Sequence, residues 1–419
     1  MRILIKNVIL NGKTTDIYIN SGKIEEIGLG LKKEAEKIIN GECKVALPSF
    51  INGHTHAAMT IFRGYADDMP LSKWLTEKIW VLESKLTEED VYWGAKLACL
   101  EMIKNGITVF NDMYWHWEAT ARATKEMGLR GFISAVFIDM FDEKKAKEQI
   151  ELNLKLYELS KEFMPNVVFT LGPHAIYSVS KESLTWTRDF SEKNGTLVHM
   201  HLSETEDEVR FAQERYNMSP VEFLDSIGLL SERFIGCHGC WLSEKECEIL
   251  GKRGAKLVHM PVSNMKLAVG KVIPHSFLSK FKVDYCLGTD GCASNNNLDM
   301  METMKFASLL AKFSTGDPTI LNAPYVYELA TKKAASIFNL GEWEIKVGLE
   351  TDIILVDLLR PELTPNFDLY SDIVYSANGY CVDTVICMGN VIMENRVVPG
   401  EEEIIRNAKK VARSLVKRI

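Results

Sequence analysis

Short apolar runs alternate with amphipathic segments of helical length through most of this chain, and no other sequence feature restricts its possible folds as strongly. Segments such as EEDVYWGAKLACLEMIKNG and KKAKEQIELNLKLYELSKEF have the periodicity of helices. Eight buried strands, each followed by a helix, predict the α/β class and a (β/α)₈ TIM-type barrel rather than an open, doubly wound sheet. The eight runs are ALPSFINGHTH, GITVFNDM, GFISAVFIDM, VVFTLGPHAIYS, TLVHMHLSETE, RFIGCHG, AKLVHMPVSN and VDYCLGTDG.

The two ends of the chain have a different pattern. Residues 1–47 contain alternating segments such as ILIKNVIL and TTDIYIN, separated by NGK and SGK turns, which predicts a small antiparallel unit. After residue 346 hairpin-like strands return, and EEEIIRNAKKVARSLVKRI predicts a terminal helix. We therefore predict a barrel over residues 48–346 and one small β-sandwich domain built from both ends, residues 1–47 and 347–419.

The composition is that of a globular chain with a large core, since 46% of its 419 residues are hydrophobic and 25% are charged. Its net charge of −8 comes from acids and bases spread along the chain, which disfavours a dedicated nucleic-acid or membrane surface. No run approaches the roughly 18 apolar residues of a membrane span, and polar residues interrupt MRILIKNVILNGK too early for a signal peptide. The nine cysteines have no framework spacing, so we expect reduced thiols and a cytoplasmic location.

Polar side chains that could do chemistry follow nearly every apolar run. In a barrel, the C-terminal ends of the strands surround one mouth, where catalytic groups collect. Seven of the nine histidines fall on the runs or at their ends, which chance would rarely arrange. The polar residues at the run ends are His54 and His56, Asn111 and Asp112, His174, His199 and His201 with Glu204, His238, Ser263 and Asn264, and Asp290.

The sequence HTH places His54 and His56 two residues apart, so that both side chains of one strand can face a single metal ion. His199 and His201 have the same spacing. Imidazole and carboxylate are the ligands of catalytic zinc or iron sites that keep one position open for water. Structural interpretations remain open at this point: buried core histidines for His-x-His, a backbone-bonded strand residue for His199, and a turn for TDG at Asp290.

Other histidines and cysteines give weaker signals. The motif CHGC holds Cys237 and Cys240, but no second pair lies at zinc-ribbon spacing, so we interpret both as structural thiols. His116, within the aromatic stretch MYWHW, is equally compatible with the barrel mouth and with packing. His259 and His275 carry no spacing argument, and we expect core or surface positions for them.

The order of these elements resembles the amidohydrolase superfamily: His-x-His on the first strand, a histidine on the fifth strand with Glu204 three residues on, His238 on the sixth and Asp290 on the eighth. More narrowly, PSFINGHTHAAM, RGYADDMPLSKWL, HLSETEDEV, PVSNMKLAVG and LGTDGCASNNNLDM are similar to segments of the branch that deaminates 5′-methylthioadenosine and S-adenosylhomocysteine. The resemblance covers essentially the full chain, including the split β domain.

The resemblance implies one divalent metal ion, zinc before iron, bound by His54, His56, His201 and Asp290. It also implies that Glu204 is the proton shuttle, that Asp290 accepts a proton from water, and that His238 orients the attacking hydroxide. Glu204 and Asp290 thereby also contact the substrate. Branches with two metals need a carboxylated lysine at the end of the fourth strand, where this sequence has LGPHAIYS, so a single ion is favoured.

On the substrate side, the resemblance matches Glu83 and His174 to positions that hold ribose hydroxyls. Trp74 and Trp80 are close enough in the sequence to flank a flat base, whereas Glu83 could instead belong to a solvated helix face. The implied reaction is metal-dependent hydrolytic deamination at C6 of adenine in a small-molecule nucleoside: 5′-deoxyadenosine, 5′-methylthioadenosine, S-adenosylhomocysteine or adenosine.

The sequence departs from this branch between residues 131 and 165. Members that favour S-adenosylhomocysteine use arginines there, whereas this segment has none, and Lys144, Lys145 and Lys147 offer point charges but no bidentate clamp. We therefore expect a substrate with a short 5′ end, unless a neighbouring subunit of a homo-oligomer, which is common in the branch, supplies the charge. The alternatives are a deaminase or hydrolase of guanine, cytosine or a triazine, and an inactive amidohydrolase-like scaffold.

Overall fold

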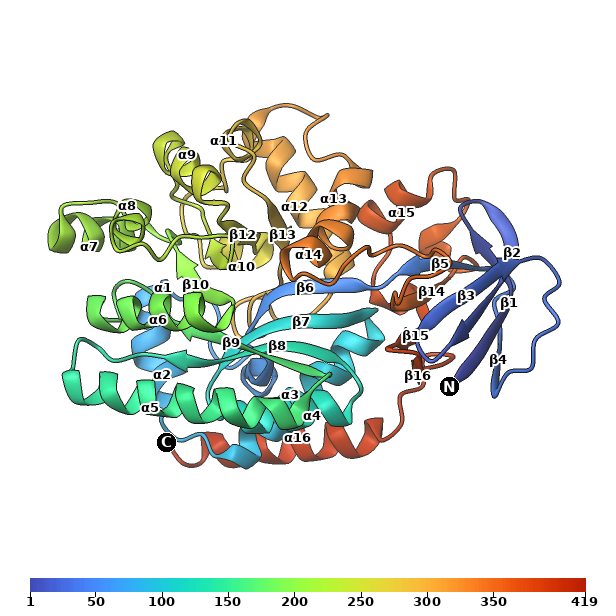
Figure 1. Ribbon diagram of the computed structural model, residues 1–419, viewed down its shortest axis with the longest axis horizontal. Helices are drawn as coiled ribbons and strands as arrows, with labels where there is room; N and C mark the ends of the chain where they lie inside the picture. Colours follow the sequence, from blue (N-terminus) through green and yellow to red (C-terminus); the bar gives the residue numbers. More distant parts are fainter.

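The eight apolar runs form the eight parallel strands of a nearly closed barrel, which confirms the predicted fold class. The computed structural model describes residues 1–419. Neighbouring strands pair in parallel and follow chain order around the sheet (Figure 1), as in a (β/α)₈ barrel. The strands are β6 (Phe50–Thr55), β7 (Ile107–Tyr114), β8 (Arg130–Phe137), β9 (Val167–Pro173), β10 (Val198–Leu202), β11 (Phe234–His238), β12 (Lys256–His259) and β13 (Tyr285–Leu287).

Two glycines allow the first and last barrel strands to approach closely. Across this seam the backbone N–H of Asp290 donates to the carbonyl oxygen of His54, at 3.0 Å. A methyl group at Gly53 would lie 2.6 Å from Cys286 Sγ, and one at Gly288 would lie 2.7 Å from the backbone nitrogen of His54. The chain segments that carry His54 and Asp290 therefore meet because each strand has a glycine where the two backbones touch.

Helices on the outside of the barrel connect most of the strands. Several begin with a capping side chain; for example, Thr87 and Asp90 form a reciprocal capping box at the start of α3. Their apolar faces pack with the outward-facing strand residues in the largest buried apolar cluster. The helices are α3 (Glu88–Lys104), α4 (Trp117–Glu126), α5 (Glu143–Ser160), η3 (Lys161–Phe163), α6 (Lys181–Asn194), α7 (Glu206–Tyr216), α8 (Pro220–Ser226), α9 (Glu244–Arg253), α10 (Pro261–Lys266), α11 (His275–Lys280), α12 (Met300–Thr315), α13 (Ala323–Leu329) and α14 (Lys332–Ile337).

A segment of short helical turns between β6 and α3 covers the C-terminal mouth of the barrel. It consists of the 3₁₀-helix η1 (Ala57–Phe62), α1 (Leu71–Lys73), the π-helix η2 (Trp74–Ile79) and α2 (Trp80–Glu83). Its apolar side chains form a buried cluster of their own with residues of α3 and the end of β7. The segment therefore forms a wall of the mouth that is built separately from the strands.

The two chain ends form one eight-stranded sheet beside the barrel (Figure 1), which confirms the small domain built from both ends. The inward-facing residues of these strands share one apolar core, as in a sandwich. The prediction that the N-terminal part is antiparallel was wrong for two strands. β4 and β5 both pair in parallel with β1. The strands are β1 (Arg2–Leu10), β2 (Lys13–Asn20), β3 (Lys23–Gly28), β4 (Lys37–Asn40), β5 (Lys44–Pro48), β14 (Ile353–Asp357), β15 (Val382–Cys387) and β16 (Asn390–Met393).

The last helix returns to the barrel. The helices of this part of the chain are η4 (Pro361–Leu363), α15 (Leu369–Tyr375), η5 (Gly379–Cys381) and α16 (Glu401–Val416). Helix α16 packs on α3, and Arg418 just after it pairs with the buried Asp90 at 2.7 Å. None of the helices combines the length and the apolar character needed to cross a membrane. The predicted boundaries at residues 47 and 346 stay a prediction.

Candidate active site

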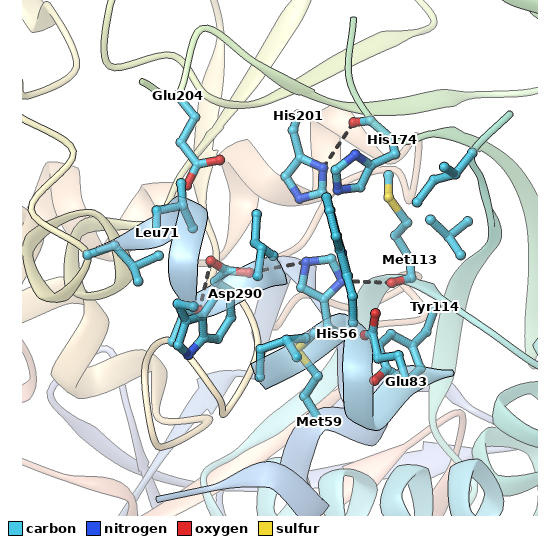
Figure 2. A pocket seen from close by; sticks show the side chains of 18 of the residues that line it. His56, Met59, Leu71, Glu83, Met113, Tyr114, His174, His201, Glu204 and Asp290 are labelled. Atoms are coloured by element: carbon cyan, nitrogen blue, oxygen red, sulfur yellow. Dashed lines mark hydrogen bonds and ion pairs between the residues drawn. The ribbon is translucent and has the colours of Figure 1, made fainter. Parts of the chain in front are cut away.

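One cavity at the C-terminal ends of the barrel strands gathers most of the predicted site residues (Figure 2). They come from the ends of β6, β9, β10 and β11, from the loop after β13, and from the covering segment. The predicted residues that line the cavity are His56, Trp74, Trp80, Glu83, His174, His201, Glu204, His238 and Asp290. The other residues predicted at the ends of the runs do not line it: His54, Asn111, Asp112, His199, Ser263 and Asn264.

The donor atoms of the predicted ligands lie in two groups that share His54. His54 Nε2 and His56 Nε2 lie 3.4 Å and 3.3 Å from Asp290 Oδ1. The donors of His54, His56 and Asp290 all lie within 4.8 Å of one another, and so do those of His54, His201 and His238. His54 is fully buried, and its Nε2 has no hydrogen-bond partner. An unpartnered buried nitrogen among imidazoles and a carboxylate fits a divalent metal ion.

Backbone carbonyls set the orientation of two of these histidines. His56 Nδ1 lies 2.7 Å from the carbonyl oxygen of Met113, and His201 Nδ1 lies 3.0 Å from that of His174 (Figure 2). A carbonyl can only accept, so in each ring Nδ1 carries the proton and donates it. The Nε2 lone pair of His56 and of His201 is thereby left for a metal ion, as is usual for metal-binding histidines.

Asp290 is held in place by hydroxyls that converge on one of its oxygens. Ser263 Oγ donates to Oδ2 at 2.5 Å and Ser294 Oγ donates to it at 3.0 Å, while the N–H of Gly291 donates to Oδ1 at 2.8 Å. Burial alone would raise the pKa of Asp290, but the close contact with His54 and the neighbouring imidazoles hold it well below its usual value. The carboxyl group is therefore an anion that directs Oδ1 toward the histidines.

Glu204 and His238 form an acid–base pair at the cavity wall. His238 Nε2 lies 3.6 Å from Glu204 Oε2, and His238 Nδ1 lies 2.8 Å from Asn264 Oδ1, to which it donates. Burial raises the pKa of Glu204. The pKa of His238 is also raised, because the Glu204 and Asp290 carboxylates outweigh the opposing effect of burial. A buried carboxyl whose pKa is raised, beside an imidazole whose pKa is also raised, is suited to take up a proton and pass it to a bound ligand.

Sequence reasoning missed Glu208, which supports Glu204. Its carboxylate accepts from the backbone N–H of Ser203 at 2.8 Å and of Glu204 at 2.9 Å. Glu208 is buried, and burial raises its pKa to about 7. The spacing of four residues in HLSETEDEV is the only sequence signal that could have revealed it. Sequence reasoning also missed Ser294, which donates to Asp290, because this contact depends on the conformation of the loop that carries Ser294.

The covering segment brings Glu83 to the side of the cavity opposite Glu204 (Figure 2). Burial raises the pKa of Glu83 to about 7, although the neighbouring Tyr114 and Trp115 act in the opposite direction. Burial also lowers the pKa of His174 to about 3, so its ring is neutral, and its Nδ1 lies 2.8 Å from Ser178 Oγ. Glu83 thus faces a cavity and does not belong to a solvated helix face.

Two tryptophans line the same cavity with their rings. Trp74 is 5% exposed, and its Nε1–H donates to the carbonyl of Ala66 at 2.9 Å. Because this donor is already used, Trp74 offers the cavity an aromatic surface and no hydrogen bond. Trp80 lines both this cavity and the wider one beside it.

A wider cavity of about 860 Å³ adjoins the first and shares Leu71, Trp80 and Glu204 among its lining residues. Lys266 is the only lysine or arginine that lines either cavity, and its Nζ is bound by Asp67 and Asn296. The lysines proposed from the sequence lie elsewhere: Lys144, Lys145 and Lys147 on α5 line neither cavity. The outer cavity therefore offers no free cationic side chain.

The remaining predicted residues lie outside the cavity. Cys237 and Cys240 are buried free thiols, as expected for structural cysteines. His116 is exposed in a left-handed turn before α4. His259 at the end of β12 and His275 at the start of α11 are buried with their rings in contact. These residues are therefore not part of the cavity, which is formed by the strand ends and the covering segment.

The chain has extensive similarity to known proteins. Residues 45–392 match the amidohydrolase family. A 5′-deoxyadenosine deaminase from Methanoregula boonei is 45% identical over 99% of this chain and 96% of its own length. The 5-methylthioadenosine/S-adenosylhomocysteine deaminase 1 of Archaeoglobus fulgidus is 46% identical over 99% of both chains. The crystal structure of an adenosine deaminase from Xanthomonas campestris with bound zinc superposes with a TM-score of 0.93 at 29% identity, over 99% of this chain and 98% of that one.

Proposed function

The chain belongs to the amidohydrolase family, and on that premise we propose that it hydrolyses the 6-amino group of adenine nucleosides to give the inosine analogue and ammonia. It is a hydrolase that acts on C–N bonds, as are the deaminases it is similar to. The observation that carries this proposal is the pairing of a buried proton donor, Glu204, with a convergent set of metal donors in one cavity.

One divalent ion, zinc before iron, is the cofactor that the donor set supports. We assign it to His54, His56 and Asp290, whose donors form one group, and to His201, which forms a second group with His54 and His238. In this assignment His238 is left to pair with Glu204. Zinc is the ion present in the related X. campestris enzyme. Bound there, the ion would make water acidic enough to supply hydroxide near neutral pH.

The side chains then divide the proton transfers between them. Asp290, an anion whose Oδ1 faces the histidines, accepts a proton from the attacking water. Glu204 delivers a proton to the ring nitrogen next to C6, and His238 orients the attacking oxygen. Collapse of the tetrahedral centre forms the C6=O bond and breaks the C6–N bond. The hydroxyl on C6 gives its proton back to Glu204, and the amino group leaves as ammonia with the proton that Asp290 held.

The residues at the other end of the cavity favour a nucleoside over a free base as the substrate. A carboxyl at Glu83 and a neutral imidazole at His174 suit the two ribose hydroxyls. The ring of Trp74 provides a flat surface for the base. Trp80 reaches the wider cavity as well, so it stands between the base and the 5′ end.

We infer a preference for nucleosides with a short or uncharged 5′ end, such as 5′-deoxyadenosine and 5′-methylthioadenosine. A carboxylate tail in the wider cavity would meet Asp68, Glu206 and Asp207, with Lys266 already bound to Asp67. Like charges in such a space disfavour a carboxylate. Two of the relatives are named for these substrates, one for 5′-deoxyadenosine and one for 5-methylthioadenosine and S-adenosylhomocysteine.

An ammonia-release assay tests the proposal across adenosine, 5′-deoxyadenosine, 5′-methylthioadenosine, S-adenosylhomocysteine, adenine, guanine and cytosine. We expect high kcat/KM for the nucleosides, lower values for S-adenosylhomocysteine, and little turnover of free bases. Comparable rates on bases and nucleosides would remove the ribose assignment, and turnover of guanine or cytosine alone would favour the other ring substrates. A chain without activity that also lacks stoichiometric metal after purification would be the scaffold.

A cytoplasmic location and a homo-oligomeric state also belong to this proposal. The nine cysteines lack a disulfide spacing pattern, which favours a reducing compartment. Sedimentation of the purified chain measures the subunit count, and we expect more than one subunit.

A further inference from the structure

His199 lies beneath the cavity and contacts a predicted metal ligand directly. It is fully buried, and its Nε2 lies 2.7 Å from His54 Nδ1 and 3.1 Å from Cys237 Sγ. It is on β10 two residues before His201, so both side chains point into the barrel, with His201 at the mouth and His199 one layer below. His199 therefore stands between the polar mouth and the apolar interior, where Cys237 belongs to the buried core.

His54 differs from the other histidine ligands in what its second nitrogen contacts. Backbone carbonyls fix His56 and His201 through their Nδ1 atoms. No carbonyl does this for His54; the partner of its Nδ1 is the His199 ring. A backbone carbonyl can only accept a hydrogen bond, whereas a histidine nitrogen can accept or donate according to its tautomer. The tautomer of the His54 ring therefore depends on the tautomer of the His199 ring.

The proton positions follow from this contact. If His54 binds a metal through Nε2, the proton of the neutral ring must lie on Nδ1. His199 Nε2 must then accept that proton's hydrogen bond, and the proton of His199 lies on its own Nδ1. That Nδ1 is buried and has no partner. The contact with His54 therefore uses the one nitrogen of His199 that has neighbours within hydrogen-bond distance.

We propose that His199 is a positioning residue for the metal site: it accepts the Nδ1 hydrogen bond of His54 and so presents His54 Nε2 to the ion. This inference rests on the proposed metal site. Cys237 touches the same nitrogen, but a thiol is a weak hydrogen-bond donor and does not replace the acceptor that His54 needs. His199 itself touches neither substrate nor the reacting atoms.

Three variants separate positioning from packing. His199→Leu keeps an apolar side chain in the space but removes the acceptor. His199→Gln retains an acceptor, because its amide oxygen can take the place of Nε2. Cys237→Ala removes an equally buried neighbour on the next strand and leaves the acceptor intact. The readouts are the zinc dissociation constant of the metal-free protein, from competition with a chromophoric chelator, and thermal unfolding of the metal-free protein.

We expect His199→Leu to weaken zinc binding by roughly 10- to 100-fold, the usual effect of removing the partner of a metal-binding histidine. His199→Gln and Cys237→Ala should stay within about threefold of the unmodified chain, and unfolding of the metal-free proteins should change little. An unchanged zinc affinity in His199→Leu would overturn the proposal, as would a His199→Gln variant as weak as the leucine variant.

Two further outcomes are also decisive. If metal-free His199→Leu does not fold, the glutamine variant alone gives the answer: near-normal zinc affinity supports positioning, and weak binding overturns it. If the unmodified chain binds no zinc, the proposed metal site itself fails, and that result is distinct from a failure confined to His199.

Discussion

Replacing Glu204 by glutamine should remove most of the activity while leaving the fold and the metal site intact. Glutamine has nearly the same shape, but its amide has no acidic proton to give to the purine ring. Glu204 is 7% exposed, and its Oε2 lies 3.6 Å from His238 Nε2, with no hydrogen bond to its side chain. The substitution therefore removes one charge contact and no structural hydrogen bond.

The size of the effect follows from the role assigned to the carboxyl. A positioned general acid or base contributes roughly 10²- to 10⁴-fold to a rate. We therefore expect kcat/KM to fall by that factor, a loss of about 3 to 5 kcal/mol of transition-state stabilisation. The free energy of unfolding should stay constant or rise, since a buried carboxyl gives way to a neutral amide with the same contacts.

Three measurements on the purified variant test this expectation: ammonia release from 5′-deoxyadenosine, bound metal per chain, and thermal unfolding. Glu206→Gln is the matched control, because Glu206 is an exposed carboxylate two residues away that lines only the wider cavity. Its activity should stay close to that of the unmodified chain. A Glu204→Gln variant within about tenfold of normal kcat/KM would refute the proton-donor role, because general acids contribute more. Loss of metal or of thermal stability together with activity would point to a structural role instead.

Three other results are expected. Burial raises the pKa of Glu83 from 4.5 to about 7, so the folded chain holds an extra proton between these pH values. Glu83 therefore lowers the free energy of unfolding by at most about 3 kcal/mol as pH rises through this range. In denaturant titrations Glu83→Gln should reduce the fall by that amount, leaving the part due to Glu208, and an unchanged slope would contradict the assignment. Gly53→Ala should lower the free energy of unfolding by at least about 1 to 3 kcal/mol through overpacking against Cys286. Adding Cys286→Ala should restore only part of this loss, because the Leu287 carbonyl would still lie 2.9 Å from the added methyl. Full stability of the Gly53→Ala variant would contradict the tight packing between the first and last strands. Chelation should lower the melting temperature, and zinc at one hundred times its Kd should restore about 2.7 kcal/mol; equal melting curves with and without zinc would argue against a bound ion.

The barrel and the ligand types could be predicted because both depend on local patterns. The apolar runs and the polar residue at the end of each run lie side by side in the sequence, and the fold class fixes which end of a strand faces the mouth. His54 and His56 illustrate this, since their spacing alone places both on one strand. The assignment of Glu83 to the cavity needed the resemblance, because no periodicity shows that a helical turn folds back over the strands.

Strand partners in the small domain were harder to predict for a similar reason. Turn sequences such as NGK correctly indicate the hairpin of β1 and β2. They say nothing about β4 and β5, which pair in parallel with β1 from positions about 35 residues away. Pairing over such a distance depends on the shared core and on β14, which arrives from the other end of the chain.

The sequence by itself determined the eight strands, the order of the polar residues at their ends and therefore the chemistry available at the mouth. Only the tertiary structure decided which of these residues act together. His199 has the same residue type and spacing as a ligand, yet it lies one layer below His201 and contacts His54. Asp290 is oriented by Ser263 on α10 and by Ser294 in the loop after β13. Hydrogen bonds between residues far apart in the sequence depend on how the barrel closes, and no local sequence pattern predicts which of these residues meet.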